Sequence, residues 1–375
     1  MRGRLALETE RTLAKPLLDE LRAGQRKWST LNAREKRLLE GAPLVDYLLD
    51  QSLALRHADP GGMVEFAEAA KLVADRIHPR RYGRRVLADL RARVWTVLGN
   101  AHRVADKHST AETALSQAAT WARRGTGSRA LFALIEEVAA VLFSDLRRFP
   151  ESIAMLDRAI AFHSRRCDVQ QTGRALISRG LVTGYAGEPE LAVAFLVRGL
   201  RFIGSDGSES GLRLPAIHAL ALNLVEAGHY AAARALIAKN ERLYRRGGSL
   251  SKLRLHWLKG KIAHGLGELG RAEADFHVAR LGFKRVEKDY DAALVSLDLA
   301  LLYAKQGKRI ATLRLVDEMI GTFRSLGIAR EAIASLLLLR RTCEDGGAVP
   351  DVLAAQIRTI ASLVAELQHH RTRAR

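Results

Sequence analysis

Cysteine, proline and aromatic residues are scarce in this sequence. Its 375 residues include 2 cysteines, 8 prolines and 6% aromatic residues. The two cysteines, Cys167 and Cys343, lie far apart, which excludes a disulfide framework and is typical of a reducing compartment. No apolar run approaches the length of about 18 residues that indicates a membrane-spanning helix, and the first residues, MRGRLALETER, carry no secretory signal. We therefore expect a soluble, cytoplasmic protein.

Motifs for catalysis and metal binding are also missing. The sequence has no P-loop, no HExxH motif and no Cys/His set at zinc spacing. Gly265, Gly267 and Gly270 match the dinucleotide fingerprint GxGxxG, but that fingerprint has to follow a strand, and here it follows a predicted helix. His163 and Cys167 stand at helical i, i+4 spacing without a third group. We expect no enzyme, no catalytic residue, no metal and no cofactor.

What the sequence does contain is a helical repeat. Residues 257–279, WLKGKIAHGLGELGRAEADFHVA, have the periodicity of two short amphipathic helices. The small residues Gly260 and Ala272 stand where the two helices would cross, and Phe276 would fill the gap beside them. The same pattern, a small residue before a large apolar one and then usually another small one, recurs every 39 to 41 residues, at Ala111/Leu115/Ala118, Ser152/Leu156/Ala159, Ala192/Leu196/Gly199, Ala233/Ile237/Asn240, Ala272/Phe276/Ala279 and Thr312/Val316/Met319.

The predicted turns follow the same period. Gly187, Gly228, Gly267 and Gly307 share one phase, and glycine permits the left-handed conformation that ends a helix. Ser109 and Glu112 form a capping-box signature, which predicts a helix that starts at Ser109. These signals together predict a solenoid of helical hairpins.

The repeat resembles the tetratricopeptide family. Trp95, Leu98 and Gly99 match its W-x2-L-G signature, with His102 where a tyrosine is expected. The period is longer than the usual 34 residues or so and is shared with armadillo and HEAT repeats, but the Trp-Leu-Gly and Ala-Phe-Ala phasing favours the tetratricopeptide type. The resemblance implies an all-α fold, an α-solenoid in the form of a right-handed superhelix.

Three parts of the chain are expected. Residues 1–43 are predicted to form an N-terminal helical cap, with one helix around Leu13 to Leu21 and another from Ser29 or Thr30 to Glu40. Residues 44–342 would hold about seven hairpins, with HPRRYGRR from His78 as an inter-repeat loop and GSDGSESG, 204–211, as a second loop. Residues 343–375 would hold a capping helix and a basic tail.

The resemblance also implies where a partner binds. In tetratricopeptide arrays the first helix of each hairpin lines the concave face. Carried over by phase, the partner-binding residues on that face are Arg93, Asn100, Arg103, Arg174, Asn223, Arg254, Trp257, Lys261 and His264. The ordered Lys/Asn/Asn/Lys/Arg clamp of the chaperone-binding members is incomplete here.

The formal net charge of +19 favours acidic partners. Its arginine-rich basis also fits the composition of a GC-rich bacterial genome, and the basic residues are spread along the chain. We expect a non-enzymatic scaffold or adaptor for another protein or peptide, for which the charge favours an acidic partner, in a bacterial signalling, regulatory or defence complex. Two alternatives are a nucleic-acid-binding basic solenoid and a peptide-sensing regulator without its own DNA-binding domain. The oligomeric state and the identity of the partner stay open at this point.

Overall fold

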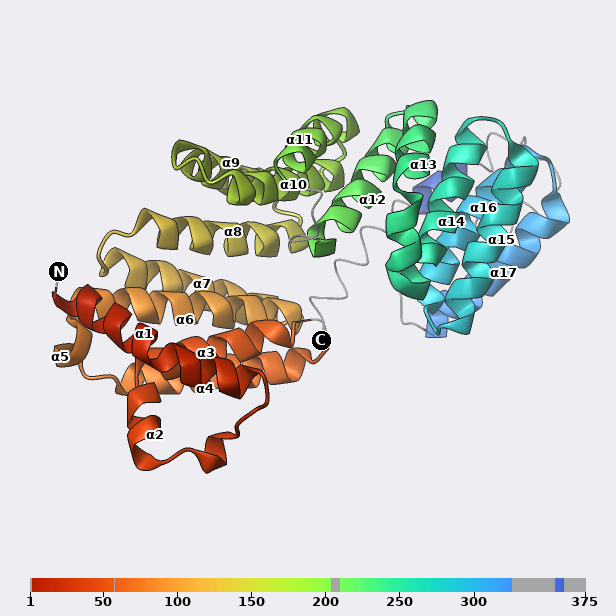
Figure 1. Ribbon diagram of the computed structural model, residues 1–375. Coiled ribbons are helices and arrows are strands. Elements are labelled where there is room, and N and C mark those ends of the chain that lie inside the picture. Colours follow the sequence, from red (N-terminus) through yellow and green to blue (C-terminus); the bar gives the residue numbers. More distant parts are fainter. Residues whose placement is uncertain (1, 57, 204–209, 326–354, 361–375) are drawn as a thin grey trace. The chain divides into compact units, whose positions relative to one another are not determined.

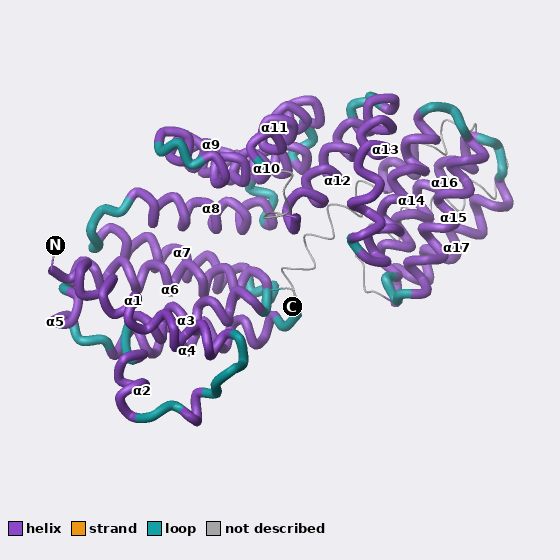
Figure 2. The backbone as a smooth tube through the Cα atoms, in the orientation of Figure 1, coloured by secondary structure: helices purple, strands orange, loops and turns teal. Residues whose placement is uncertain are grey.

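The described part of the chain consists of helices joined by short turns and loops. The computed structural model describes residues 2–56, 58–203, 210–325 and 355–360, and no strand occurs among them (Figures 1 and 2). The α-helices are α1 (Arg2–Arg22), α2 (Ala33–Leu39), α3 (Ala42–Ala54), α4 (Pro60–Arg76), α5 (Pro79–Tyr82), α6 (Arg84–Val104), α7 (His108–Arg123), α8 (Arg129–Asp145), α9 (Phe149–Arg165), α10 (Val169–Tyr185), α11 (Pro189–Phe202), α12 (Ser210–Glu226), α13 (Tyr230–Arg246), α14 (Gly248–Gly265), α15 (Leu269–Arg285), α16 (Asp289–Lys305) and α17 (Arg309–Ser325), and a 3-10 turn spans Trp28–Thr30.

The repeated small and large residues hold each hairpin together, as predicted. On α15, Ala272, Phe276 and Ala279 are buried on one face at helical spacing. A Cβ atom added to Gly260 on α14 would lie 2.6 Å from the ring of Phe276. The same close approach recurs between Gly99 and Leu115 and between Gly180 and Leu196. Because only glycine leaves room for these large side chains, the two helices pack tightly, and the predicted tetratricopeptide-like hairpin is confirmed.

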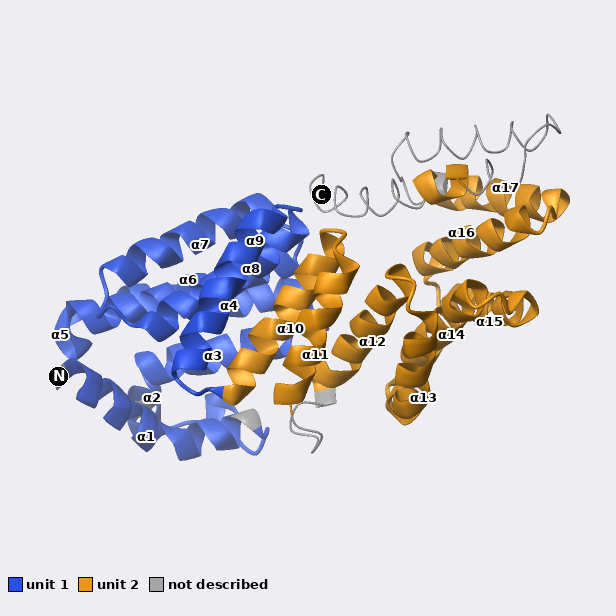
Figure 3. Ribbon diagram, turned by 90° about the horizontal axis from the view of Figure 1, so that it is seen from above, with its two compact units in different colours: residues 1–168, 375 blue, residues 169–374 orange. Residues whose placement is uncertain are grey.

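The chain divides into two compact units, residues 1–168 and 169–374, shown in separate colours in Figure 3. Unit 1 contains the hairpins α3/α4, α6/α7 and α8/α9, together with α1, α2 and α5. Its largest core cluster joins α3, α4 and α6 through side chains such as Leu49, Met63 and Leu98. Unit 2 contains the hairpins α10/α11, α12/α13, α14/α15 and α16/α17. Both units are therefore stacks of hairpins of the α-solenoid class.

The N-terminal segment departs from the sequence prediction in its details. The expected helix around Leu13 to Leu21 is part of α1, which begins at Arg2 and packs through Ala14, Leu17 and Leu18. The next helix is α2, and Asn32 caps it rather than Ser29 or Thr30. The Asn32 side chain accepts from the Glu35 N–H while the Glu35 carboxylate accepts from the Asn32 N–H, each at 2.9 Å, which is a complete capping box.

Two other local predictions were wrong. Pro79 to Tyr82 form the short helix α5 instead of a loop, because His78 caps it and Tyr82 is buried. Ser109 does not cap α7: the helix already begins at His108, directly after the left-handed residue Asp106, and no side-chain cap is present. A turn that places Asp106 at a φ of 58° fixes the start of the helix before Ser109 is reached.

Left-handed residues end the first helix of each of the six hairpins from α6/α7 onward. Gly187, Gly228, Gly267 and Gly307 have positive φ, as their common phase predicted. In unit 1 the same place is taken by Asp106 and Arg147, which lack the conformational freedom of glycine.

Most of the predicted C-terminal part, and residues 204–209 of the predicted second loop, lie outside the described residues. Residues 355–360 are helical, and Ile357 and Ile360 are buried in the same cluster as Val316 and Met319 of α17.

Candidate functional site

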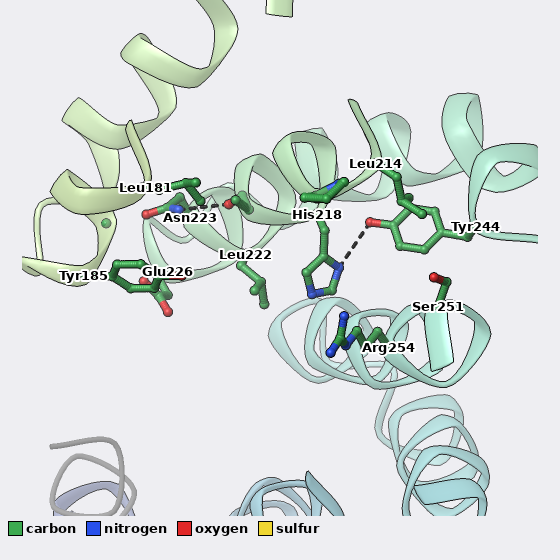
Figure 4. A pocket seen from close by; sticks show the side chains of 13 residues that line it. Leu181, Tyr185, Leu214, His218, Leu222, Asn223, Glu226, Tyr244, Ser251 and Arg254 are labelled. Carbon is green, nitrogen blue, oxygen red and sulfur yellow. Dashed lines mark hydrogen bonds between the residues drawn. The ribbon is translucent and has the colours of Figure 1, made fainter. Parts of the chain in front are cut away.

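A cavity of about 380 Å³ opens in unit 2 among the first helices of three consecutive hairpins. α10, α12 and α14 supply most of its wall, and α13 adds Tyr244. Figure 4 shows Tyr185, Asn223 and Glu226 toward one end and His218, Tyr244 and Arg254 toward the other. The lining residues are Leu181, Gly184, Tyr185, Leu214, Pro215, His218, Ala219, Leu222, Asn223, Glu226, Tyr244, Ser251 and Arg254.

Asn223 is the most constrained polar group of the cavity. Its side chain is only 7% exposed, and its Nδ2 donates to the backbone oxygen of Ala219 at 2.8 Å. Its Oδ1 is buried and has no hydrogen-bond partner among the described residues. A Cβ atom on Gly184 would lie 2.6 Å from that oxygen, so glycine at this position is what makes room for the amide. Buried polar atoms are nearly always paired, so this oxygen retains an unused hydrogen-bonding capacity within the described residues.

His218 and Tyr244 form the other end of the cavity. The His218 Nδ1 and the Tyr244 hydroxyl lie 3.2 Å apart. Burial, reinforced by the positive charge of Arg254, lowers the pKa of His218 to about 4, so the imidazole is neutral at pH 7. Burial also raises the pKa of Tyr244, which keeps the phenol protonated. This end therefore offers neutral hydrogen-bonding groups beside one cation.

Glu226 and Arg254 supply the charges of the cavity wall. Both side chains are exposed at the cavity, and among the described residues neither has an ion-pair partner. The pKa of Glu226 is raised because the surrounding protein displaces water from its carboxyl group, and Lys261 offsets part of that effect. Arg254 acts electrostatically on both His218 and Asp291.

The predicted site residues of unit 1 are engaged within the protein. The Arg93 guanidinium donates to Asp46 Oδ1 of α3 at 2.6 Å, and Arg11 of α1 donates to Asp46 Oδ2 at 2.7 Å. Arg103 donates to Asn100 Oδ1 at 3.1 Å and to Asp145 of α8 at 2.9 Å. These bonds connect first helices of adjacent hairpins.

Trp257 and Lys261, two of the predicted residues of α14, also make polar contacts inside unit 2. The Trp257 indole donates to Asp298 of α16 at 2.6 Å, and the Lys261 ammonium donates to the same carboxylate at 3.0 Å. The Trp257 ring meets Phe283 edge-on. The His264 Nε2 is buried without a hydrogen-bond partner in the described residues, and burial lowers the pKa of this imidazole.

The structure thus brings Asn223 and Arg254 together at one cavity. Arg174 lies exposed on α10 and does not line that cavity. Sequence reasoning missed Tyr185, His218, Glu226 and Tyr244, although the first three lie on the first helices that it had identified. On these helices Tyr185 and Glu226 stand two residues before the left-handed glycine and His218 stands nearly three turns before it, and these places in the repeat were the signal that could have found them.

Neither a metal site nor a membrane span is found in the described parts of the chain. No group of three or more His, Cys, Asp or Glu side chains there could hold a metal ion. Likewise, none of the helices described is long and apolar enough to cross a membrane.

Comparison with solved structures returns helical-repeat proteins. The chain is similar to a Rap protein complexed with Competence and Sporulation Factor, with a TM-score of 0.64, 14% sequence identity and coverage of 88% of this chain and 91% of that chain. It is also similar to a tetratricopeptide repeat protein from Parabacteroides merdae, with a TM-score of 0.50, 17% identity and coverage of 79% and 98%. No family model matches the sequence, and no curated protein matches it significantly. At these identities the likeness shows the fold alone.

Proposed function

We propose that this protein is a non-enzymatic scaffold that binds a short segment of a partner protein or peptide in the cavity formed by α10, α12 and α14. The observation that carries the proposal is the buried Asn223 amide, which lines a ligand-sized cavity and whose Oδ1 has no hydrogen-bond partner among the described residues. Leaving such an acceptor unpaired costs about 1–3 kcal/mol. A bound donor would recover that free energy.

A peptide backbone is the ligand chemistry that fits this amide best. Asn223 Oδ1 can accept from a peptide N–H, and the second hydrogen on Nδ2 can donate to a peptide carbonyl. Leu181, Leu214 and Leu222 supply apolar wall for the side chains of the bound segment. The volume of about 380 Å³ is at the lower end of the range of ligand pockets and suits a few residues rather than a folded domain.

The fold comparisons favour the same class of function. The Rap protein of similar fold was solved as a complex with Competence and Sporulation Factor, so a stack of this kind carries a bound ligand there. Of the residues predicted from phase, Asn223 and Arg254 enter our site directly. Arg93, Asn100, Arg103, Trp257 and Lys261 would act by fixing the first helices relative to their neighbours within each unit.

The cellular setting is part of the proposal. A net charge of +19 would accelerate encounter with an acidic partner, and we place the protein in the cytoplasm, in a bacterial signalling, regulatory or defence complex. Residues 1–43 would cap one end of the repeats and residues 343–375 the other, because the ends of solenoids need a polar cover.

The test is partner capture by matched asparagine variants of the full chain. Asn223→Ala removes the unpaired amide, whereas Asn240→Ala removes an amide on α13 whose Nδ2 makes the same local bond, to the backbone oxygen of Leu236 at 2.8 Å. We expect a stoichiometric partner that survives nuclease and moderate salt to be lost with Asn223→Ala and kept with Asn240→Ala. Equal capture by both variants would contradict the site.

A second variant, Gly184→Ala, tests the position of the Asn223 amide rather than its presence. Gly184→Ala keeps Asn223 but places a Cβ atom 2.6 Å from its oxygen, so the amide has to move. We expect capture to weaken as it does with Asn223→Ala. Loss of all captured material on nuclease treatment would instead support the alternative function, nucleic-acid binding, and its steep dependence on salt.

A further inference from the structure

We infer that the cavity of unit 2 selects segments with a positive group at one end and a negative group at the other, bound by Glu226 and Arg254 respectively. This inference rests on the proposed function and adds the charge pattern of the ligand. It follows from three features: the charges in the wall, their places at opposite ends of the cavity on α12 and α14, and the lack of ion-pair partners among the described residues.

The two charges lie at opposite ends of the cavity. Figure 4 shows Glu226 beside Tyr185 and Asn223, and Arg254 beside His218 and Tyr244. His218 and Glu226 are eight residues apart on α12, which corresponds to about 12 Å along a helix axis. An extended peptide advances about 3.3 Å per residue, so a segment of about four residues covers the stretch of α12 from Glu226 to His218, beside which Arg254 lies.

The space between the charges is apolar. Leu222 lies between the two ends in Figure 4, and Leu181, Leu214 and Ala219 also line the cavity. Asn223 stands next to this stretch, at the Glu226 end of the cavity, and can hold the peptide backbone. The arrangement suits a segment with a basic group, one or two apolar residues and an acidic group.

Neither Glu226 nor Arg254 forms an ion pair with another described residue. Lys261 and Asp298 on the neighbouring helices form an ion pair at 3.0 Å. Glu226 and Arg254, in contrast, have no ion-pair partner within the described residues. Lys261 reaches Glu226 only through its field, and Asp291 stands in the same relation to Arg254. A ligand that supplies opposite charges can therefore form two charge-assisted hydrogen bonds without breaking an existing pair.

The ligand charges have two sources. They can be side chains, such as lysine and aspartate, or the amino and carboxyl termini of a free peptide of about four residues. Both sources present an ammonium or guanidinium group to Glu226 and a carboxylate to Arg254. Capping the termini distinguishes them.

The experiment is selection of random hexapeptide libraries by the full-length protein. One library has acetylated and amidated termini, and the other has free termini. The variants are Glu226→Lys, Arg254→Glu and Asn223→Ala, with Glu190→Lys and Arg198→Glu as controls that change the net charge equally on exposed positions of α11. Selected peptides are resynthesised, and their affinities are measured by calorimetry.

The wild type is expected to enrich peptides that carry one basic and one acidic residue about three positions apart. Glu226→Lys should favour two acidic residues and Arg254→Glu two basic ones, each losing about ten- to hundredfold in affinity for the wild-type peptides. The α11 controls should select as the wild type does. If the pattern appears only with free termini, the charges come from the termini and the inference stands.

The outcomes separate the two proposals. Peptides enriched without a charge pattern, and lost with Asn223→Ala, would overturn the charge selectivity and leave the proposed function intact. An identical charge pattern in Glu226→Lys, Arg254→Glu and the wild type would also overturn the selectivity. If no peptide is retained from either library, both proposals fail.

Discussion

The two units use the same repeat position in opposite ways. Arg93 in unit 1 and Arg254 in unit 2 each stand 13 residues before the left-handed residue that ends the helix, Asp106 and Gly267 respectively. Arg93 forms an ion pair with Asp46 at 2.6 Å, whereas Arg254 has no ion-pair partner in the described part of the chain. Arg93 and Arg254 therefore occupy the same position in the repeat but have different roles.

The difference shows what makes a first helix able to bind a ligand. On α6, the polar side chains Arg93, Asn100 and Arg103 bond to one another or to neighbouring first helices. On α12, Asn223 and Glu226 face a cavity with hydrogen-bonding capacity left over. A polar side chain that is bonded within the protein stabilises the stack of hairpins, whereas one with unused hydrogen-bonding capacity can bond to a ligand. The predictions below separate these two roles.

The largest effect is expected for Asp46→Ala in unit 1. This carboxylate is 14% exposed and accepts from both Arg11 and Arg93, so its removal leaves two half-buried guanidinium groups without their acceptor. We expect a loss of about 2–4 kcal/mol in the free energy of unfolding, measured by urea denaturation followed by circular dichroism. Asp75→Ala, which removes a pair with Lys71 at 3.0 Å and a longer one with Arg91 at 3.8 Å from a more exposed carboxylate, is the control and should cost less than about 1 kcal/mol. Equal effects of the two variants would mean that Asp46 is not a structural junction.

The next effect concerns acid sensitivity in unit 2. The pKa of His218 is lowered from 6.5 to about 4 in the folded state, by burial and by Arg254. Between these two pKa values the unfolded state binds more protons than the folded state. Titration of His218 therefore lowers the free energy of unfolding as the pH falls from about 6.5 to 4. Between pH 7 and pH 5, the wild type should lose about 1–2 kcal/mol more than His218→Gln does. Parallel pH profiles for the two proteins would contradict the lowered pKa.

The sequence predicted the frame of the molecule better than its contacts. Periodic apolar residues and phased glycines suffice for the hairpins, since a pattern such as Gly260 opposite Phe276 depends on residues of one repeat. Pairings such as Arg93 with Asp46 join helices 47 residues apart in sequence, and no local pattern encodes them. Trp257 was placed by its phase on the partner-binding face, and its indole N–H donates to Asp298. Which polar groups line the cavity depends on which of them are paired with neighbouring helices. For this reason the sequence predicted only Asn223 and Arg254 among the residues of the cavity wall.

A smaller effect separates binding from stability at Asn223. Asn223→Leu removes a buried oxygen that has no partner among the described residues and gives up one bond to Ala219. Because an unpaired buried acceptor costs more than a typical hydrogen bond contributes, we expect stability to be unchanged or to rise by about 1 kcal/mol. Partner binding should be lost in the same variant. A destabilisation of more than about 1 kcal/mol would show that the amide is a structural group like Arg93.

The smallest effect concerns the turns, where the two units differ again. Arg147 in unit 1 and Gly187 in unit 2 occupy the same turn position, with φ of 57° and 86°. The left-handed backbone is sterically unfavourable for a residue with a Cβ atom but not for glycine. Arg147→Gly should therefore raise the free energy of unfolding by about 0.5 kcal/mol. Gly187→Ala should lower it by about 1 kcal/mol, and because no atom lies within 4 Å of the added Cβ, that loss would come from the backbone alone.

Arg147→Ala is the matched control, since it removes the contact between the Arg147 guanidinium and the Phe149 ring while keeping the backbone cost. If Arg147→Gly is no more stable than Arg147→Ala, the left-handed turn is not a source of strain in unit 1, and the preference for glycine in unit 2 needs another cause.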